Sequence, residues 1–149
     1  MELKDFIKPE LVNLNLRSTD KKSVINELIK LLKDNSYITD EEAIFQKVMK
    51  REELSTTGVG NGIAIPHVKS SDVKEAAIVI GKSEPGIDFN SLDNKPCYLF
   101  FLIAAPEKSE DQHLKLLAKL SRMLVHQDFR EQLMNASNPD EIREVINRD

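Results

Sequence analysis

Cysteine is almost missing from this sequence, since Cys97 is the single example among 149 residues. One cysteine excludes an internal disulfide and fits a reducing cytosol, so we expect a cytoplasmic protein. Cys97 lies inside an apolar run with no glycine- or serine-rich loop around it. We therefore interpret it as a core residue and not as a reactive thiol.

Long apolar runs and blocks of positive charge are missing as well. The longest apolar run, residues 97–105, is far shorter than the roughly 20 residues that span a bilayer. The N-terminus MELKDFIKPE lacks the basic-then-apolar order of a secretory signal. The net charge is −4, with acids and bases interspersed, so the basic stripe that nucleic acid requires is missing. We expect neither membrane insertion nor nucleic-acid binding.

Helix-period and strand-period segments alternate along the chain. A hydrophobic content of 40% over 149 residues can form one proper core but is short for two. We predict a single α/β domain over residues 1–149, with three layers in α/β/α order and a central mixed sheet of about five strands. Strands are expected at residues 12–16, 63–65, 76–81 and 96–105.

Capping residues mark the predicted helix starts. Thr39 with Glu42 and Ser109 with Gln112 have the spacing of capping boxes, and Asn138 precedes a proline at the first helical position. The helices are predicted to follow Thr19, Thr39, Ser109, Asp128 and Asn138. Between the two long apolar strands, the tripeptide 84–86 (EPG) predicts a turn.

The stretch TGVGNGIAIPH, residues 57–67, combines three glycines, a short apolar strand and a histidine behind a proline. A Walker loop needs a lysine and a hydroxyl after its glycines, and a dinucleotide fingerprint needs a strand before them and a helix after them. Both readings fail here. What remains is a flexible or tightly turned loop that feeds a short strand and presents His67 where strand gives way to loop. An ordinary loop histidine is the alternative.

Arg51 and His113 are two further candidate site residues besides His67. Arg51 shares a helix face with Ile44 and Val48, so its guanidinium is expected to meet an anion. The alternatives are that it snorkels past Val48 to solvent, or that it pairs with Glu52, Glu53 or a carboxylate elsewhere. His113 lies in the first turn of a later helix, where the helix N-terminus lowers the pKa of a histidine. A half-buried structural histidine is the alternative there. His126 has no motif around it and receives no role.

These segments together resemble the enzyme IIA domain of the bacterial phosphoenolpyruvate-dependent sugar phosphotransferase system, in its fructose/mannitol class. The resemblance is carried by REELSTTGVGNGIAIPH, by PGIDFNSLDNKPCYLFFLIAAPE and by the H-L-x-x-L-x-x-L pattern from His113, and it covers essentially the whole chain. It implies that His67 accepts a phosphoryl group from the histidine-containing phosphocarrier protein. It also implies that His67 passes the group to a cysteine of enzyme IIB, which works with the membrane enzyme IIC.

The resemblance assigns supporting roles to Arg51 and His113. A fork-shaped guanidinium suits phosphoryl oxygens, and an imidazole can donate one hydrogen bond to them. The segment with Thr57, Gly58, Gly60 and Gly62 is expected to offer backbone N–H groups, and Thr57 a hydroxyl. We expect no metal and no cofactor.

Two other functions stay open at this point. Nitrogen-type regulatory enzyme IIA proteins share the GVGNGIAIPH core and bind partner proteins according to their phosphorylation state. A metal-binding or hydrolytic site that uses His67 and His113 is the second alternative, although no third ligand has metal-like spacing. The sugar and a possible fusion to further domains are left open by the sequence.

Overall fold

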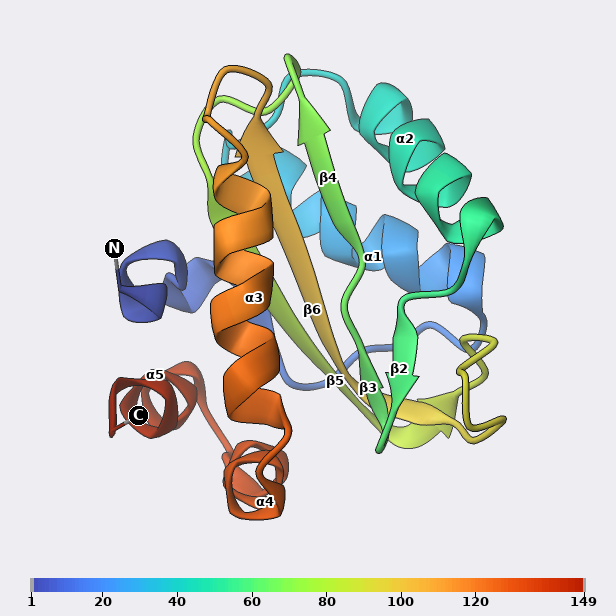
Figure 1. Cartoon of the computed structure of the whole chain (residues 1–149), viewed down its shortest axis with the longest axis vertical. Coiled ribbons are helices and arrows are strands. Elements are labelled where there is room, and N and C mark those ends of the chain that lie inside the picture. The colour runs from blue at the N-terminus through green and yellow to red at the C-terminus, as the bar shows by residue number, and fades with distance from the viewer. Residues whose placement is uncertain (1, 149) are drawn as a thin grey trace.

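A mixed sheet of six strands forms the middle layer of the fold (Figure 1). The structure is a computed structural model that describes residues 2–148. The strands are β1 (Val12–Asn13), β2 (Gly58–Gly60), β3 (Ile63–Ala64), β4 (His67–Ser70), β5 (Ala77–Ile87) and β6 (Cys97–Pro106). Their order is β1-β5-β6-β3-β2, and β4 pairs with β6 beyond the end of β3. This confirms the predicted fold class.

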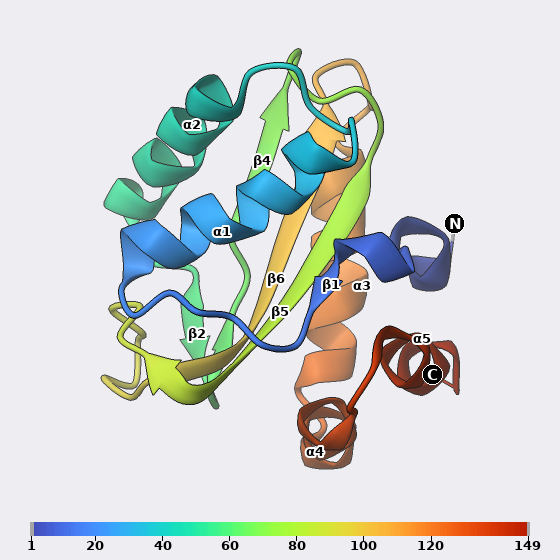
Figure 2. The ribbon, with the colours of Figure 1, turned by 180° about the vertical axis from the view of Figure 1, so that it is seen from behind.

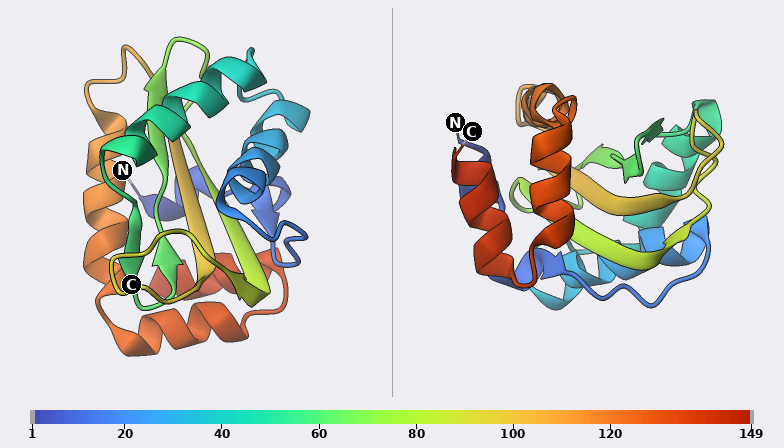
Figure 3. Two further views of the ribbon diagram at one scale, coloured as in Figure 1. Left: turned by 90° about the vertical axis from the view of Figure 1, so that its right-hand side faces the viewer. Right: turned by 90° about the horizontal axis from the view of Figure 1, so that it is seen from below.

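Helices cover both faces of the sheet. They are α1 (Lys21–Asp34), α2 (Glu41–Leu54), α3 (Gln112–Leu124), α4 (Gln127–Asn135) and α5 (Pro139–Arg148), and two short 3-10 turns, η1 (Leu3–Phe6) and η2 (Pro9–Leu11), precede β1. Helices α1 and α2 lie on one face and α3 on the other, as seen from behind in Figure 2 and from below in Figure 3. Helix α4 contacts α3, and α5 contacts both α4 and η1, so η1 and α5 lie on the same side of the sheet as α3. Within residues 2–148, none of the helices has the length and apolar character that a membrane span requires.

Strand β6 holds the two faces together. Its side chains alternate between the two hydrophobic clusters, so that Phe100 and Leu102 join the cluster under α1 and α2, while Phe101 and Ile103 join the cluster under α3. All four are fully buried. A strand buried on both faces reads as a continuous apolar run, which is why the sequence predicted it correctly. Burial of each such side chain contributes about 1.5–3 kcal/mol to folding.

Aspartates, and not the predicted threonines, cap the first two helices. Asp20 accepts a hydrogen bond from the Ser23 N–H (2.8 Å), and Asp40 accepts one from the Ala43 N–H (3.0 Å). The predictions that named Thr19 and Thr39 were therefore wrong by one residue. The physical reason is that a carboxylate makes a charge-assisted bond to the positive end of a helix.

The caps of the later helices differ in outcome. The predicted Ser109 box is wrong, since the Ser109 hydroxyl donates to the Pro106 carbonyl (2.6 Å) and α3 starts after Asp111, whose φ is 61°. The predicted cap at Asp128 is wrong as well, since α4 starts after His126 and Asp128 lies inside its first turn. The last prediction is confirmed, because Asn138 accepts the Glu141 N–H (2.9 Å) ahead of α5.

Two strand boundaries differ from the prediction. Strand β1 ends at Asn13 and not at residue 16, because the Asn13 side chain accepts the Asn15 N–H (2.9 Å) and turns the chain. Strand β5 continues through the predicted turn at 84–86 to Ile87. Gly86 takes a φ of 86° there, and the pairing with β6 shifts register. The tripeptide is an irregularity within a strand, and the reversal between β5 and β6 occurs over residues 88–96.

Gly81 allows β5 to pack closely against α1. A Cβ atom at this position would lie 2.8 Å from methyl carbons of both Leu16 and Leu28, which are buried. We expect Gly81→Ala to lower the free energy of unfolding by about 1–3 kcal/mol, because added volume strains a filled core. Urea denaturation measures this change. In a Leu16→Ala background the cost of Gly81→Ala should be smaller, and an equal cost in both backgrounds would contradict the packing explanation.

Candidate functional site

The glycine stretch forms a β-hairpin and not the predicted loop. Strands β2 and β3 pair antiparallel, and the turn between them places Gly60, Asn61 and Gly62 at φ values of 100°, 58° and 78°. Glycine tolerates this left-handed region without the penalty that a side chain brings. After the hairpin, Ile65 and Pro66 lead into β4, which begins at His67.

His67 is the first residue of β4, whereas the sequence placed it in a loop after a strand. It pairs with Ile103 of β6 in the same register that joins Ile63 to Leu99 in β3. Between the two strands, the Pro66 carbonyl accepts the Ile103 N–H (3.0 Å), so the gap in the ladder is still tied to β6. The position of His67 is therefore fixed by a strand that is buried on both faces.

One hydrogen bond fixes the tautomer of His67. Its Nδ1 lies 3.0 Å from the carbonyl oxygen of Ile65. A carbonyl can only accept a hydrogen bond, so Nδ1 carries the proton and Nε2 keeps a free lone pair. The Nε2 of the half-buried ring is therefore the nucleophilic nitrogen.

A cleft of about 570 Å³ brings the three predicted side chains together. Strand β4 lies between α2 and α3 in Figure 1, and residues from the second half of α2, from β4 and from the start of α3 line the cleft. The rings of His67 and His113 are 6.2 Å apart between centroids and are tilted by 36°. The lining residues are Lys47, Lys50, Arg51, Leu54, His67, Val68, Lys69, His113 and Leu114.

Arg51 lies in the last turn of α2. Its Nη1 donates to the carbonyl oxygen of Ser55 (2.8 Å), which leaves the other N–H groups of the guanidinium uncommitted by that bond. The neighbouring Glu52 binds Lys21 and Thr57, so the alternative of an Arg51–Glu52 pair is not observed. Arg51 can thus present donors to an anion in the cleft.

Glu52 is a structural residue of the site that the sequence analysis missed. Its buried carboxylate accepts the Thr57 N–H (3.0 Å) and hydroxyl, and it pairs with Lys21 (2.9 Å). These bonds tie the last turn of α2 to the start of the hairpin, and so hold Arg51 in place relative to His67. The spacing of Ile44, Val48 and Glu52, four residues apart on one helix face, was the signal available in the sequence.

The remaining residues proposed for a phosphoryl loop do not line the cleft. Thr57 gives both its N–H and its hydroxyl to Glu52. A Cβ on Gly58 would lie 3.0 Å from the Cα of Ser91, so this glycine permits close packing of the segment 88–96. Gly60 and Gly62 belong to the hairpin turn. These four residues support the strand that carries His67 and are not gathered around its ring.

Positive charge dominates the cleft. Lys47, Lys50, Arg51 and Lys69 line it, and Lys69 forms an ion pair with Asp111 (3.2 Å). Burial lowers the pKa of His113, and the neighbouring His67 and Lys69 lower it further, while Asp111 opposes them. The predicted direction is confirmed, although the causes are burial and neighbouring charge. These causes together disfavour the charged form of His113, and the neutral imidazole can both donate and accept hydrogen bonds.

This charge distribution bears on the metal-site alternative. Among residues 2–148, no group of three or more His, Cys, Asp or Glu side chains is arranged to hold a metal ion. Cations around both imidazoles repel a metal cation and attract an anion. The cleft is suited to an anionic group.

The other reactive side chains lie elsewhere. Cys97 is fully buried, and burial raises the pKa of its thiol to about 11, which confirms the prediction of a core residue.

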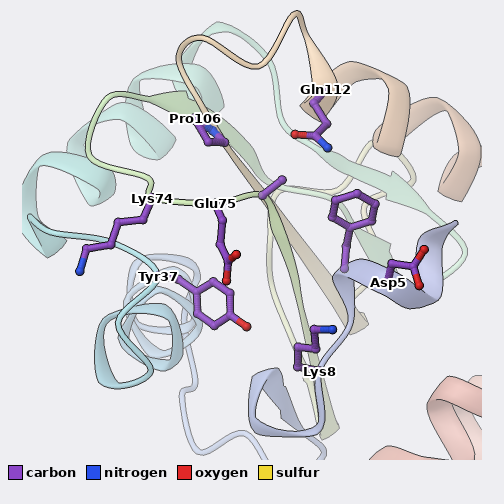
Figure 4. Close-up of a pocket in the computed structure, with 9 residues that line it drawn as sticks. Asp5, Lys8, Tyr37, Lys74, Glu75, Pro106 and Gln112 are labelled. Atoms are coloured by element: carbon purple, nitrogen blue, oxygen red, sulfur yellow. The ribbon is translucent and has the colours of Figure 1, made fainter. Parts of the chain in front are cut away.

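A separate cavity of about 440 Å³ lies between the N-terminal segment and the start of α3 (Figure 4). Its lining balances Asp5 and Glu75 against Lys8 and Lys74, so it lacks the net positive charge of the His67 cleft.

Comparisons with known protein families identify what this chain resembles. Residues 5–149 match the family model described as "Phosphoenolpyruvate-dependent sugar phosphotransferase system, EIIA 2". The fructose-specific EIIABC component of Bacillus subtilis is 37% identical over 99% of this chain, which spans 23% of that relative. The nitrogen regulatory protein of Bradyrhizobium diazoefficiens is 34% identical over 98% of this chain and 95% of its own length.

Solved structures give the same result for the fold. The nitrogen regulatory protein IIA-Ntr of Neisseria meningitidis superposes with a TM-score of 0.88 at 29% identity, covering 96% of this chain and 97% of that one. The complex of enzyme IIAMTL with phosphorylated enzyme IIBMTL from Escherichia coli matches with a TM-score of 0.81 at 22% identity, covering 95% and 97%. The second match supports the fold alone.

The ionisation of His113 provides a test of this geometry. We expect NMR titration to give His113 a pKa below the ordinary histidine value, because burial and nearby cations disfavour its charged form. Lys69→Met should raise this pKa by removing a positive charge, and Asp111→Asn should lower it by removing a negative one. Shifts in the same direction for both variants would contradict the charge arrangement.

Proposed function

Because the chain belongs to the enzyme IIA family, type 2, of the phosphoenolpyruvate-dependent sugar phosphotransferase system, we propose that His67 is the residue that carries the phosphoryl group. Enzyme IIA components of this system are phosphotransferases that work through a phosphohistidine. The single observation that supports His67 is its hydrogen bond from Nδ1 to the Ile65 carbonyl, which leaves Nε2 as the nucleophile beside Arg51.

The transfer step follows from this tautomer. The lone pair of Nε2 attacks the phosphorus of a donor phosphohistidine in line, and the N–P bond of the donor breaks as the new N–P bond forms. The His67 ring becomes positively charged, and the Nδ1–H bond to the Ile65 carbonyl stabilises that charge. A phosphoimidazolium ring is a good leaving group, so the phosphoryl group can be passed on to an acceptor thiolate.

Arg51 and His113 are proposed to bind the phosphoryl oxygens. A fork-shaped guanidinium next to a developing negative charge stabilises the loose transition state. His113 lies on a different helix and reaches the same cleft, so it can donate one hydrogen bond from the opposite side. Thr57 and the glycines of the hairpin are assigned a supporting role, because their groups serve the turn and Glu52.

The partners follow from the place of enzyme IIA in the pathway. Enzyme IIA works with enzyme IIB, and the name of the Bacillus subtilis relative joins components A, B and C in one chain. We propose that the donor is the histidine-containing phosphocarrier protein, the acceptor a cysteine of enzyme IIB, and the transported substrate fructose or a close analogue. We further propose that residues 1–149 form one enzyme IIA domain, which acts in the cytoplasm with a membrane enzyme IIC.

A regulatory function of the nitrogen type is the second candidate. The nitrogen regulatory proteins from two organisms support it, through 34% sequence identity in one and a TM-score of 0.88 in the other. Such a protein would keep its phosphohistidine in the presence of sugar. Identity to the fructose-specific relative, at 37%, favours transport.

Phosphorylation of His67 can be measured by intact mass. After incubation with phosphoenolpyruvate, enzyme I and the phosphocarrier protein, we expect the wild-type chain to gain one acid-labile phosphoryl group. His67→Ala should gain none, because the proposed acceptor is Nε2 of His67. His126→Ala is the matched control and should be labelled like wild type, since His126 lies outside the cleft. An acid-stable label, or a label on His67→Ala, would exclude this assignment.

The acceptor distinguishes transport from regulation. When the phosphorylated chain is mixed with a fructose-specific enzyme IIB and IIC in membrane vesicles, we expect loss of the phosphohistidine only after fructose is added, with fructose phosphate as product. Mannitol vesicles with their own IIB and IIC serve as the control. Retention of the label in every vesicle, together with normal labelling by the donor, would support the regulatory function.

A further inference from the structure

Lys69 and His67 lie on the same face of β4. Alternate residues of a strand share one face, so Lys69 and His67 project from the same side of β4, while Val68 and Ser70 are buried on the other side. Both Lys69 and His67 line the same cleft as Arg51 and His113. An ammonium group is thus attached two residues from the nucleophile on the same rigid strand.

The present partner of Lys69 is a weak one. Its Nζ lies 3.2 Å from Asp111 Oδ1, and the two side chains are 36% and 62% exposed. An exposed ion pair in water contributes little net stability, so exchange of the partner costs little. Asp111 immediately precedes α3 in a left-handed conformation with φ 61°, and its side chain makes no cap to that helix. The contact is therefore available for exchange.

The net positive charge of the cleft favours a more highly charged anion than Asp111 as the partner of Lys69. The cleft is lined by four cationic side chains, Lys47, Lys50, Arg51 and Lys69. The carboxylate paired with Lys69 is that of Asp111. Lys47 is already bonded to the Ser70 hydroxyl (3.0 Å) on the other side of β4. A phosphoryl group on Nε2 would bring about two negative charges into the cleft that Lys69 lines. Two charges on phosphoryl oxygens attract an ammonium group more strongly than one exposed carboxylate does.

We propose that Lys69 is a further catalytic residue of this site, which leaves Asp111 and binds an oxygen of the phosphoryl group as the group arrives at His67. The proposal rests on the phosphoryl transfer to His67 described above. No bond to Lys69 forms or breaks in the step, since Lys69 contributes its charge and a hydrogen bond. Departure of Lys69 also releases Asp111 at the start of α3, so that the phosphorylated and free forms differ at this point of the surface.

A set of four variants tests the role of Lys69. The rate of phosphorylation by the phosphocarrier protein is measured in rapid-quench experiments over a range of donor concentrations. Lys69→Met should lower the rate at saturating donor roughly 10-fold, with a smaller effect on the half-saturating concentration, because a charge-assisted bond in the transition state is lost. Lys69→Arg should retain most of the rate. Lys115→Met removes an exposed lysine of α3 outside the cleft and should behave like wild type.

Asp111→Asn separates a direct role from a structural one. If Lys69 binds the phosphoryl group, this variant frees the lysine and should be phosphorylated at least as fast as wild type. If Lys69 only anchors α3 through the ion pair, Asp111→Asn and Lys69→Met should be slowed equally, and that result would overturn the proposal. A wild-type rate for Lys69→Met would overturn it as well. Absence of label on the wild-type chain would instead remove the proposed function, and the role of Lys69 with it.

Discussion

The parallel pairing of β6 with both β3 and β4 is the constraint on which the rest of the structure depends. Because β6 is buried on both faces, its register cannot slip without moving apolar side chains out of two clusters at once. That fixed register places His67 opposite Ile103. It also leaves β4 between α2 and α3 (Figure 1), and residues of all three elements line the cleft. The cleft is thus a consequence of how the core is packed.

Around this scaffold, buried polar bonds set the orientation of the reacting groups. Glu52 joins the last turn of α2 to the hairpin through Thr57 and is neutralised by Lys21, so a charged side chain is accommodated in the interior with its bonds satisfied. The Ile65 carbonyl fixes the imidazole of His67 in one tautomer. Phosphoryl transfer needs positioning and electrostatic stabilisation more than covalent help from the protein, and these contacts provide the positioning.

The sequence predicted the layers, the central strand, most helices and the three residues that meet in the cleft. Its errors have local physical causes. Asp20 and Asp40 took the capping roles expected of the adjacent threonines, because a carboxylate binds a helix N-terminus more strongly. The glycine loop became a hairpin because its backbone pairs with β3, and the turn at 84–86 stayed within β5 because pairing with β6 continues beyond it. Strand pairing overrides turn chemistry when a central strand supplies the partner.

The sequence by itself determined what local chemistry controls: the apolar strands, the helix faces, and the short strand and proline that lead into His67. Only the tertiary structure decided which nitrogen of His67 is free, that Glu52 binds Thr57, and that Lys69 pairs with Asp111 in the cleft that His67 lines. The physical reason is that a tautomer or an ion pair depends on which carbonyl or carboxylate comes within about 3 Å. Ile65 is near His67 in the chain, and Thr57 is near Glu52, but only the folded backbone turns these groups toward each other. Lys69 and Asp111 are distant in the chain and are brought together by the packing of β4 against the start of α3.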